Sequence, residues 1–278
     1  MPFSLPLAAL ALTLLGGLAL ILGPVLAYAR AYVERLEAAF AATGAAAATG
    51  AAADTGAAEA AGSVAHQASS GPTPPQPTAP AIRRRWLLHP VAQLLLALLL
   101  GGSTALWAWH YGQVHDGVVA VPTIMLLGTA GSIDAICHRL PNRILGGAAA
   151  WLGLGLMAQI VVLLLRSGSL ATASLVPLRA GLVALALGGA VFLMAWLRAG
   201  LGAGDVKLCA VTGLWLGQLG WSAALTGFVI GFFLAGLLAL VLLATGQAKL
   251  KTRVALGPAL ILGAWLAWLL QMAAGAAS

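Results

Sequence analysis

Long runs of apolar residues recur along the chain and constrain its fold more than any other feature. A helix needs about 20 such residues to cross a hydrocarbon core of roughly 30 Å, because lipid offers no partner for an unpaired backbone group. Eight runs approach this length, over residues 4–28, 86–109, 117–137, 143–165, 177–198, 205–219, 221–244 and 254–273. The sequence therefore predicts an all-α integral membrane protein, a polytopic bundle of about eight transmembrane helices.

The sixth run, residues 205–219, is the weakest of the eight. It is short for a full crossing, and little more than Gly220 separates it from the seventh run. We expect this segment to be tilted, re-entrant or half-length.

The basic residues predict an orientation. The first run has no Lys or Arg before its apolar core and is followed by Arg30 and Arg35, so we interpret it as a retained helix with its N-terminus outside. Alternating through the spans leaves only Arg166 and Arg179 outside, as the positive-inside rule requires. The cytoplasmic set is Arg30, Arg35, Arg83, Arg84, Arg85, Arg139, Arg143, Arg198, Lys207, Lys249, Lys251 and Arg253. The net charge of +7 thus reflects topology in a cell membrane and predicts no nucleic-acid partner.

Residues 30–85 differ from the rest of the chain. Residues 38–82 are rich in Ala, Gly and Thr and then in Pro, which predicts a flexible cytoplasmic linker. Residues 30–40 are expected to prolong the first helix by a few turns. We divide the chain into a first transmembrane helix (1–29), a helix extension with a linker (30–85) and a membrane-embedded core (86–278).

Two acidic residues stand out by their apolar context. Asp134 and Asp205 lie inside or at the ends of apolar runs, whereas the other five acids lie in the linker, its leading helix or an outer loop. A charge in the hydrocarbon region costs at least about 2.5–3.5 kcal/mol, so a membrane carboxylate indicates a functional site. The predicted topology places both residues at cytoplasmic helix ends, and hence at one depth.

The segments around the two acids predict turns. Pro141 and Asn142 end the helix that carries Asp134. A structural alternative for Asp134 is pairing with Arg139 or His138.

Gly202 and Gly204 precede the helix of Asp205, whose carboxylate would lie in the first turn. Helix capping is the structural alternative for Asp205. The joint placement of the two acids nevertheless favours a shared site.

Three segments carry a family resemblance. Asp134 followed by Leu-Pro-Asn at 140–142, the Gly-Ala-Gly-Asp-Val-Lys-Leu segment at 202–208, and Ala-Leu-Gly-Pro-Ala-Leu at 255–260 appear in this order. The set resembles the type IV prepilin peptidases and preflagellin peptidases, which are GxGD intramembrane aspartyl peptidases, over residues from about 86 to 273. The presenilin group pairs its GxGD motif with Tyr-Asp, whereas here Ile133 precedes Asp134.

The resemblance implies an aspartic endopeptidase that removes the leader peptide of a prepilin or pseudopilin at the cytoplasmic membrane face. Asp134 and Asp205 would activate water, with no metal or other cofactor. Residues of the matching motifs are expected to bind substrate or to form the active-site loops: Gly202, Gly204, Pro141, Asn142, Lys207, Gly257 and Pro258.

The chain departs from the bifunctional members of this family in its cysteines. Those members carry a cytoplasmic domain with paired zinc-binding cysteines and also methylate the new N-terminus, whereas residues 30–85 contain no cysteine. We therefore carry over the peptidase activity alone. Cys137 and Cys209 are interpreted as packing residues.

Two other classes of function use similar features. A transporter can use membrane carboxylates as proton or cation ligands, although normally near the bilayer midplane. A non-catalytic component of a pilus or secretion machine is the third hypothesis. His138, Arg139, Arg143 and Lys207 form a basic rim that serves topology or contacts a lipid phosphate or an acidic substrate residue.

Overall fold

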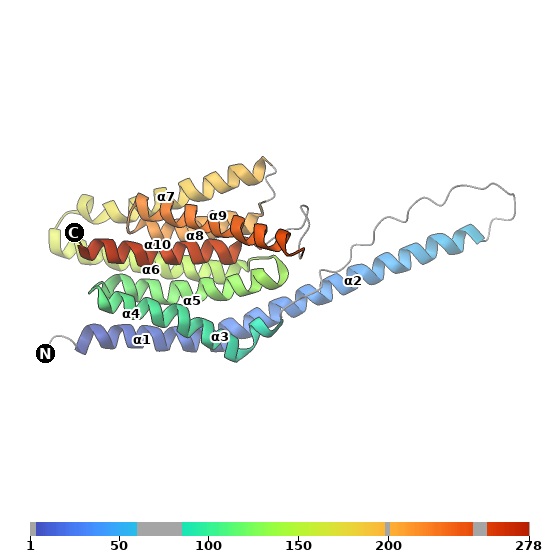
Figure 1. The fold of residues 1–278 in the computed structure, drawn as a ribbon, viewed down its shortest axis with the longest axis horizontal. Helices are drawn as coiled ribbons and strands as arrows, with labels where there is room; N and C mark the ends of the chain where they lie inside the picture. The colour runs from blue at the N-terminus through green and yellow to red at the C-terminus, as the bar shows by residue number, and fades with distance from the viewer. Residues whose placement is uncertain (1–3, 60–84, 198–200, 247–254, 278) are drawn as a thin grey trace.

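The computed structural model describes residues 4–59, 85–197, 201–246 and 255–277, and nearly all of these residues are helical (Figure 1). Seven helical segments in this part of the chain are long and apolar enough to cross a membrane. They correspond to seven of the eight predicted runs. The eighth is the short helix α8 (Ala203–Gly217), which has 15 residues and spans about 22 Å along its axis. The prediction of an all-α polytopic bundle with a short sixth element is confirmed.

The first segment is bent near its middle. Helix α1 (Ser4–Leu20) passes through a π-helical turn (Ile21–Val25) into α2 (Leu26–Glu59). Gly23 leaves the helical region, with φ −91° and ψ −105°, just before Pro24. Proline lacks an N–H and its ring displaces the preceding turn, so the kink falls there.

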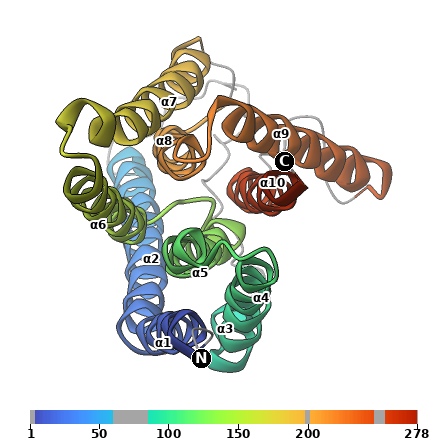
Figure 2. The ribbon, with the colours of Figure 1, turned by 90° about the vertical axis from the view of Figure 1, so that its left-hand side faces the viewer.

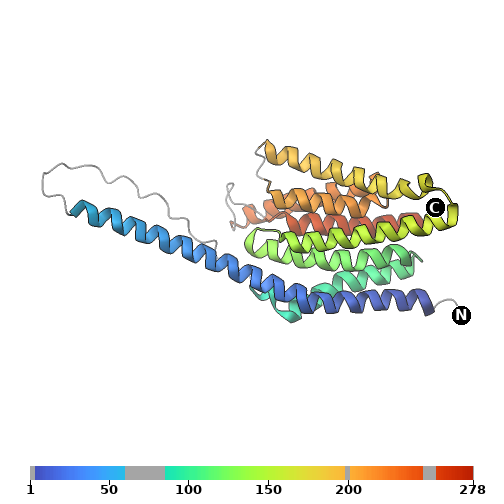
Figure 3. The same ribbon diagram turned by 180° about the vertical axis from the view of Figure 1, so that it is seen from behind.

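Helix α2 is longer than the sequence predicted. It continues past Phe40 to Glu59 and projects beyond the bundle, as Figure 3 shows from behind. Alanine, which dominates residues 38–59, is the best helix former, and this preference outweighs the glycines among them. The remainder of the expected linker, residues 60–84, lies outside the described residues. So do six basic residues of the predicted cytoplasmic set: Arg83, Arg84, Arg198, Lys249, Lys251 and Arg253.

The second span consists of α3 (Pro90–Ala97), a π-helical turn (Leu98–Gly102) and α4 (Ser103–His110). A short 3₁₀ turn (Arg85–Leu88) precedes it. Pro90 occupies the first helical position, where a missing N–H costs nothing, and the His89 ring accepts a hydrogen bond from the Val91 N–H.

Helix α5 (Val114–Cys137) is the central element of the bundle (Figure 2). Its residues are buried on all sides from Val119 to Asp134. The hydroxyls of Thr123 and Ser132 donate to carbonyls one turn earlier in the same helix, so these polar groups do not remain unpaired in the core. A helix buried all round in this way can hold a functional side chain in a fixed position.

Helices α6 (Asn142–Ser167) and α7 (Leu170–Trp196) follow, and α7 packs closely on α8. A Cβ added at Gly213 or Gly217 would lie 2.9–3.0 Å from the backbone of Ala184 or Ala180. This close approach holds α8 inside the bundle. Helix α8 is too short to cross the membrane by itself, so its position depends on such packing.

Helices α9 (Trp221–Ala244) and α10 (Gly257–Ala277) form the second closely packed pair. A Cβ added at Gly263 would overlap the backbone of Gly231. The indole of Trp268 in α10 stacks with that of Trp215 in α8, with ring centroids 6.4 Å apart. This contact ties α8 to α10.

Candidate active site

Asp134 lies in the last turn of α5. The helix ends at His138, which adopts a left-handed conformation (φ 51°), and the His138 N–H donates to the Asp134 carbonyl at 2.8 Å. The Asp134 side chain is 5% exposed. Its Oδ2 accepts a 3.0 Å hydrogen bond from the backbone N–H of Gly257, at the start of α10. The carboxyl group is therefore fixed between two helices that lie far apart in sequence.

Asp205 lies in the first turn of α8. Its Oδ2 accepts a 2.9 Å hydrogen bond from the backbone N–H of Gly202, the residue that caps this helix. The capping role considered from the sequence is thus present, and the helix N-terminus favours a negative charge there. Among the described residues, neither Oδ1 of Asp205 nor Oδ1 of Asp134 has a hydrogen-bond partner. Each carboxyl group therefore retains one oxygen that can bind another group, such as a water molecule.

Both aspartates line one cavity of about 660 Å³. The cavity is formed at the end of the bundle from which α2 projects, where α5 ends and α6, α8 and α10 begin. It is lined by Tyr32, Asp134, His138, Arg139, Leu140, Asn142, Ala195, Leu201, Gly202, Ala203, Gly204, Asp205, Lys207, Ala255 and Leu256.

A polar contact joins α8, which carries Asp205, to the start of α6, the helix that follows Asp134 in the chain. The Lys207 ammonium, one turn after the start of α8, donates a 2.9 Å hydrogen bond to Oδ1 of Asn142, the first residue of α6. A Cβ added at Gly204 would lie 3.2 Å from Cβ of Leu140, so the first turn of α8 also packs against the loop before α6. The absence of a side chain at Gly204 permits this approach.

The sequence-predicted site residues divide into three groups. The cavity is lined by Asp134, Asp205, Gly202, Gly204, Asn142 and Lys207. Gly257 acts on it through Asp134, and there is no space for a side chain at this position, because a Cβ would lie 2.6 Å from Oδ2 of Asp134. Pro141 and Pro258 do not line the cavity.

Each of these two prolines lies within two residues of a cavity-lining residue in the sequence. Pro141 precedes α6, where its carbonyl accepts from the N–H groups of Ile144 and Leu145. Pro258 faces a separate apolar cavity of about 270 Å³ between α3, α5 and α10. Both fit better as structural residues that set the starts of their helices than as groups in contact with a substrate.

The predicted basic rim is split by the structure. His138, Arg139 and Lys207 line the aspartate cavity, whereas Arg143 lines a neighbouring apolar cavity. The guanidinium of Arg139 lies 5.8 Å from the ring centroid of Phe40, and that of Arg143 lies 5.6 Å from the ring centroid of Tyr28. Neither arginine forms an ion pair within the described part of the chain. The cation–π contacts tie α2 to the ends of α5 and α6.

Sequence reasoning missed Tyr32, Leu201, Ala255 and Leu256 as cavity-lining residues. Tyr32 reaches the site because α2 passes the end of the bundle at which the cavity lies (Figure 1). The spacing of Tyr28 and Tyr32, four residues apart on one helix face, is a sequence signal that could have indicated this contact. The other three residues are ordinary apolar neighbours of the motifs, and no sequence signal distinguishes them.

Metal-binding side chains are sparse in the described residues. No group of three His, Cys, Asp or Glu side chains there lies close enough together to hold a metal ion. Cys137 and Cys209 are unpaired thiols, one half-buried and one buried. The arrangement that the cavity does provide is a pair of carboxyl groups beside three basic side chains.

The fold and this cavity define a polytopic helical membrane protein with two carboxyl groups at one end of its bundle. Comparison with family models identifies the class more closely. Residues 121–243 match the type IV leader peptidase family, and this range includes both Asp134 and Asp205. The match confirms the resemblance inferred from the motifs. No curated protein and no solved structure matches the chain.

Proposed function

We propose that the protein is an intramembrane aspartic endopeptidase in which Asp134 and Asp205 form the catalytic pair. The observation that carries the proposal is that the two carboxyl groups line one cavity while each has one oxygen held by a glycine N–H. Such backbone contacts fix the orientation of a carboxyl group without adding a charge. The two remaining oxygens are then available to a water molecule and a substrate carbonyl.

The proposed mechanism follows from the presence of two acids in one cavity of an apolar helix bundle. Like charges at close range cannot both ionise easily, so the pair shares one proton. The ionised carboxylate accepts a proton from a water molecule, whose oxygen bonds to the scissile carbonyl carbon. The protonated carboxyl group donates a hydrogen bond to the oxyanion that develops. Collapse of the intermediate breaks the C–N bond, and the leaving amine takes up the proton that the carboxylate accepted from water.

The proposed substrate is a membrane protein of the prepilin or pseudopilin kind, with a short leader ahead of an apolar helix. The family match supports this class of substrate. The cavity lies at the end of the bundle, where such a leader would meet its helix. We place this end at the cytoplasmic face and the N-terminus of the chain outside, because this orientation satisfies the positive-inside rule.

Co-expression with a leader-containing prepilin tests the proposal. Wild-type protein is expected to convert the prepilin to a shorter form on a gel, whereas Asp134→Asn and Asp205→Asn, which keep the side-chain shape, are expected to leave it uncut. Asp116→Asn is the matched control, since Asp116 lies in the first turn of the same helix as Asp134 and outside the cavity. A processed product from either site variant, at wild-type levels of inserted protein, contradicts the assignment.

A further inference from the structure

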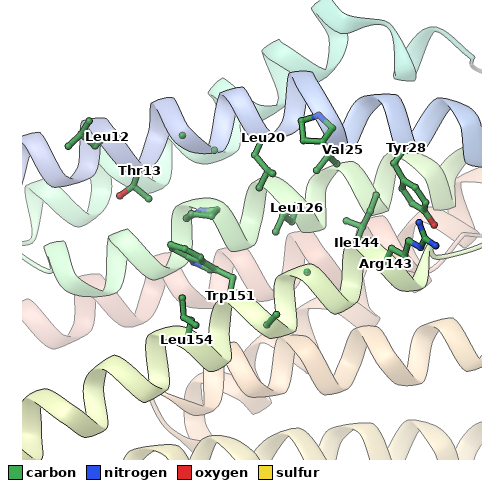
Figure 4. A pocket seen from close by; sticks show the side chains of 16 residues that line it. Leu12, Thr13, Leu20, Val25, Tyr28, Leu126, Arg143, Ile144, Trp151 and Leu154 are labelled. Atoms are coloured by element: carbon green, nitrogen blue, oxygen red, sulfur yellow. The ribbon is translucent and has the colours of Figure 1, made fainter.

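A second cavity lies beside the aspartate site and is mostly apolar (Figure 4). Its volume is about 800 Å³. One wall is the first helical segment from Leu12 to Tyr28, the other is the first half of α6, and Pro122 and Leu126 of α5 form the floor. We refer to this space as the lateral groove, since α1 and α6 contribute exposed side chains to the outer surface of the bundle on either side of it.

The walls of the lateral groove carry small residues, and two of them, Gly16 and Gly147, have no packing partner among the described residues. Gly16, Gly17, Gly147 and Ala150 all line it. A Cβ added at Gly16 or Gly147 would meet no atom within 4 Å. These glycines differ from Gly263, where a Cβ would overlap the backbone of the neighbouring helix. Small residues on membrane helices permit close approach of another helix backbone, and here that helix is not supplied by the described chain.

The lateral groove is continuous with the aspartate site through two residue pairs. Tyr28 and Arg143 close one end of the groove, with the guanidinium over the ring. One helical turn from Tyr28, Tyr32 lines the aspartate cavity, and the two rings lie 6.0 Å apart. Asn142, next to Arg143, lines the same cavity. A chain that leaves the groove at Tyr28 therefore arrives directly at the two carboxyl groups.

The dimensions of the lateral groove suit one face of a membrane helix. The 17 residues from Leu12 to Tyr28 span about 25 Å along a helix, close to the thickness of the hydrocarbon core of roughly 30 Å. A volume of 800 Å³ accommodates the side chains on one helix face, while the opposite face would remain in lipid. An acyl chain would also fit an apolar groove, but it needs neither glycines on both walls nor an exit into a catalytic cavity.

We infer that the lateral groove between α1 and α6 receives the apolar helix of the substrate and holds its leader junction at the Tyr28–Arg143 end. This inference rests on the proposed peptidase function and adds a docking site for the part of the substrate that is not cleaved. Binding energy gained along the helix then positions the scissile bond at Asp134 and Asp205.

The test fills the groove without touching the carboxyl groups. Gly16→Leu and Gly147→Leu place a side chain in open space, so the fold can accept them. Gly153→Leu is the matched control, because Gly153 lies on the same helix as Gly147, also has nothing within 4 Å, and does not line the groove. Two substrates are compared: a purified prepilin with leader and helix intact, and a short peptide that spans its leader and cleavage junction but ends before the helix.

The groove variants are expected to cleave the intact prepilin with kcat/KM lowered about tenfold or more, mainly through KM, as expected when ground-state packing is blocked. They should cleave the short peptide as wild-type protein does, and Gly153→Leu should match wild-type protein on both substrates. Wild-type kinetics of the groove variants on the intact prepilin would overturn the docking site and leave the peptidase function intact. Equal loss on both substrates would also overturn it, since the change would then act on the catalytic cavity.

A photo-crosslinking residue in place of Leu154, which lines the groove, identifies the occupant. Crosslinking to the prepilin helix supports the inference, and crosslinking to phospholipid with the prepilin present in excess contradicts it. The proposed function fails separately, if wild-type protein cleaves neither the prepilin nor the peptide.

Discussion

Gly257 donates its backbone N–H to Oδ2 of Asp134 at 3.0 Å, across 123 residues of sequence. The contact joins the start of α10 to the last turn of α5, and no side chain takes part from the glycine. Gly202 makes the equivalent contact to Asp205, which lies three residues later in the same turn. The two carboxyl groups are thus oriented in the same manner by backbone groups from different parts of the fold.

The contact predicts that Gly257→Ala strongly lowers the cleavage activity. A Cβ at this position would lie 2.6 Å from Oδ2 and 3.1 Å from Cγ of Asp134, so the carboxyl group or α10 must shift. A displacement of about 1 Å at a catalytic group can cost on the order of 100-fold in rate, and we expect a loss of that size in kcat/KM. Gly236→Ala, on α9 with nothing within 4 Å, is the control and should leave cleavage unchanged. Activity of Gly257→Ala within about threefold of wild type would contradict the role given to this contact.

The contact between Lys207 and Asn142 predicts a measurable energetic coupling. The hydrogen bond of 2.9 Å is exposed, so we expect a coupling energy of about 0.5–1.5 kcal/mol between the two positions. A double-mutant cycle with Lys207→Met and Asn142→Ala, read out as kcat/KM on the prepilin, measures it. If the two effects are fully additive, the contact does not help to hold the first turn of α8 against α6, and Lys207 acts on the cavity by itself.

The packing of α9 on α10 predicts a stability effect that is separate from catalysis. Gly263→Ala would place a methyl group on the backbone of Gly231, which we expect to destabilise the protein by about 1–3 kcal/mol. Thermal unfolding of the purified protein in detergent should show a lower midpoint for this variant. Gly236→Ala again serves as the control on α9. An unchanged midpoint for Gly263→Ala would show that the two helices can separate at no cost.

Much of this architecture could be predicted from the sequence because apolar run length determines where a membrane helix begins and ends. The end of α5 and the start of α6 follow from Pro141 and Asn142, and the start of α8 follows from Gly202 and Gly204. The common depth of the two aspartates could be predicted from the alternation of the spans alone. A shared site was the expectation drawn from that depth, whereas the cavity itself was not predicted.

The remaining features depend on contacts that run length does not encode. The hydrogen bond from Gly257 to Asp134 results from the packing of α10 against α5, and the lateral groove results from a space that α1 and α6 leave between them. The contribution of Tyr32 depends on the continuation of α2 beyond the bundle. That continuation was underestimated because the glycines and prolines of residues 38–82 were weighted above the helix propensity of alanine.

The central claim is that Asp134 and Asp205 act as one catalytic unit, and single-turnover cleavage by the purified variants tests it most directly. Residues that act as a unit show strongly non-additive effects, because removing either one already abolishes the shared step. Asp134→Asn and Asp205→Asn are each expected to lose about 10³-fold or more in the cleavage rate, and the double variant is expected to lose no more than the worse single variant. Substantial cleavage by either single variant, or losses that multiply in the double variant, would contradict the claim.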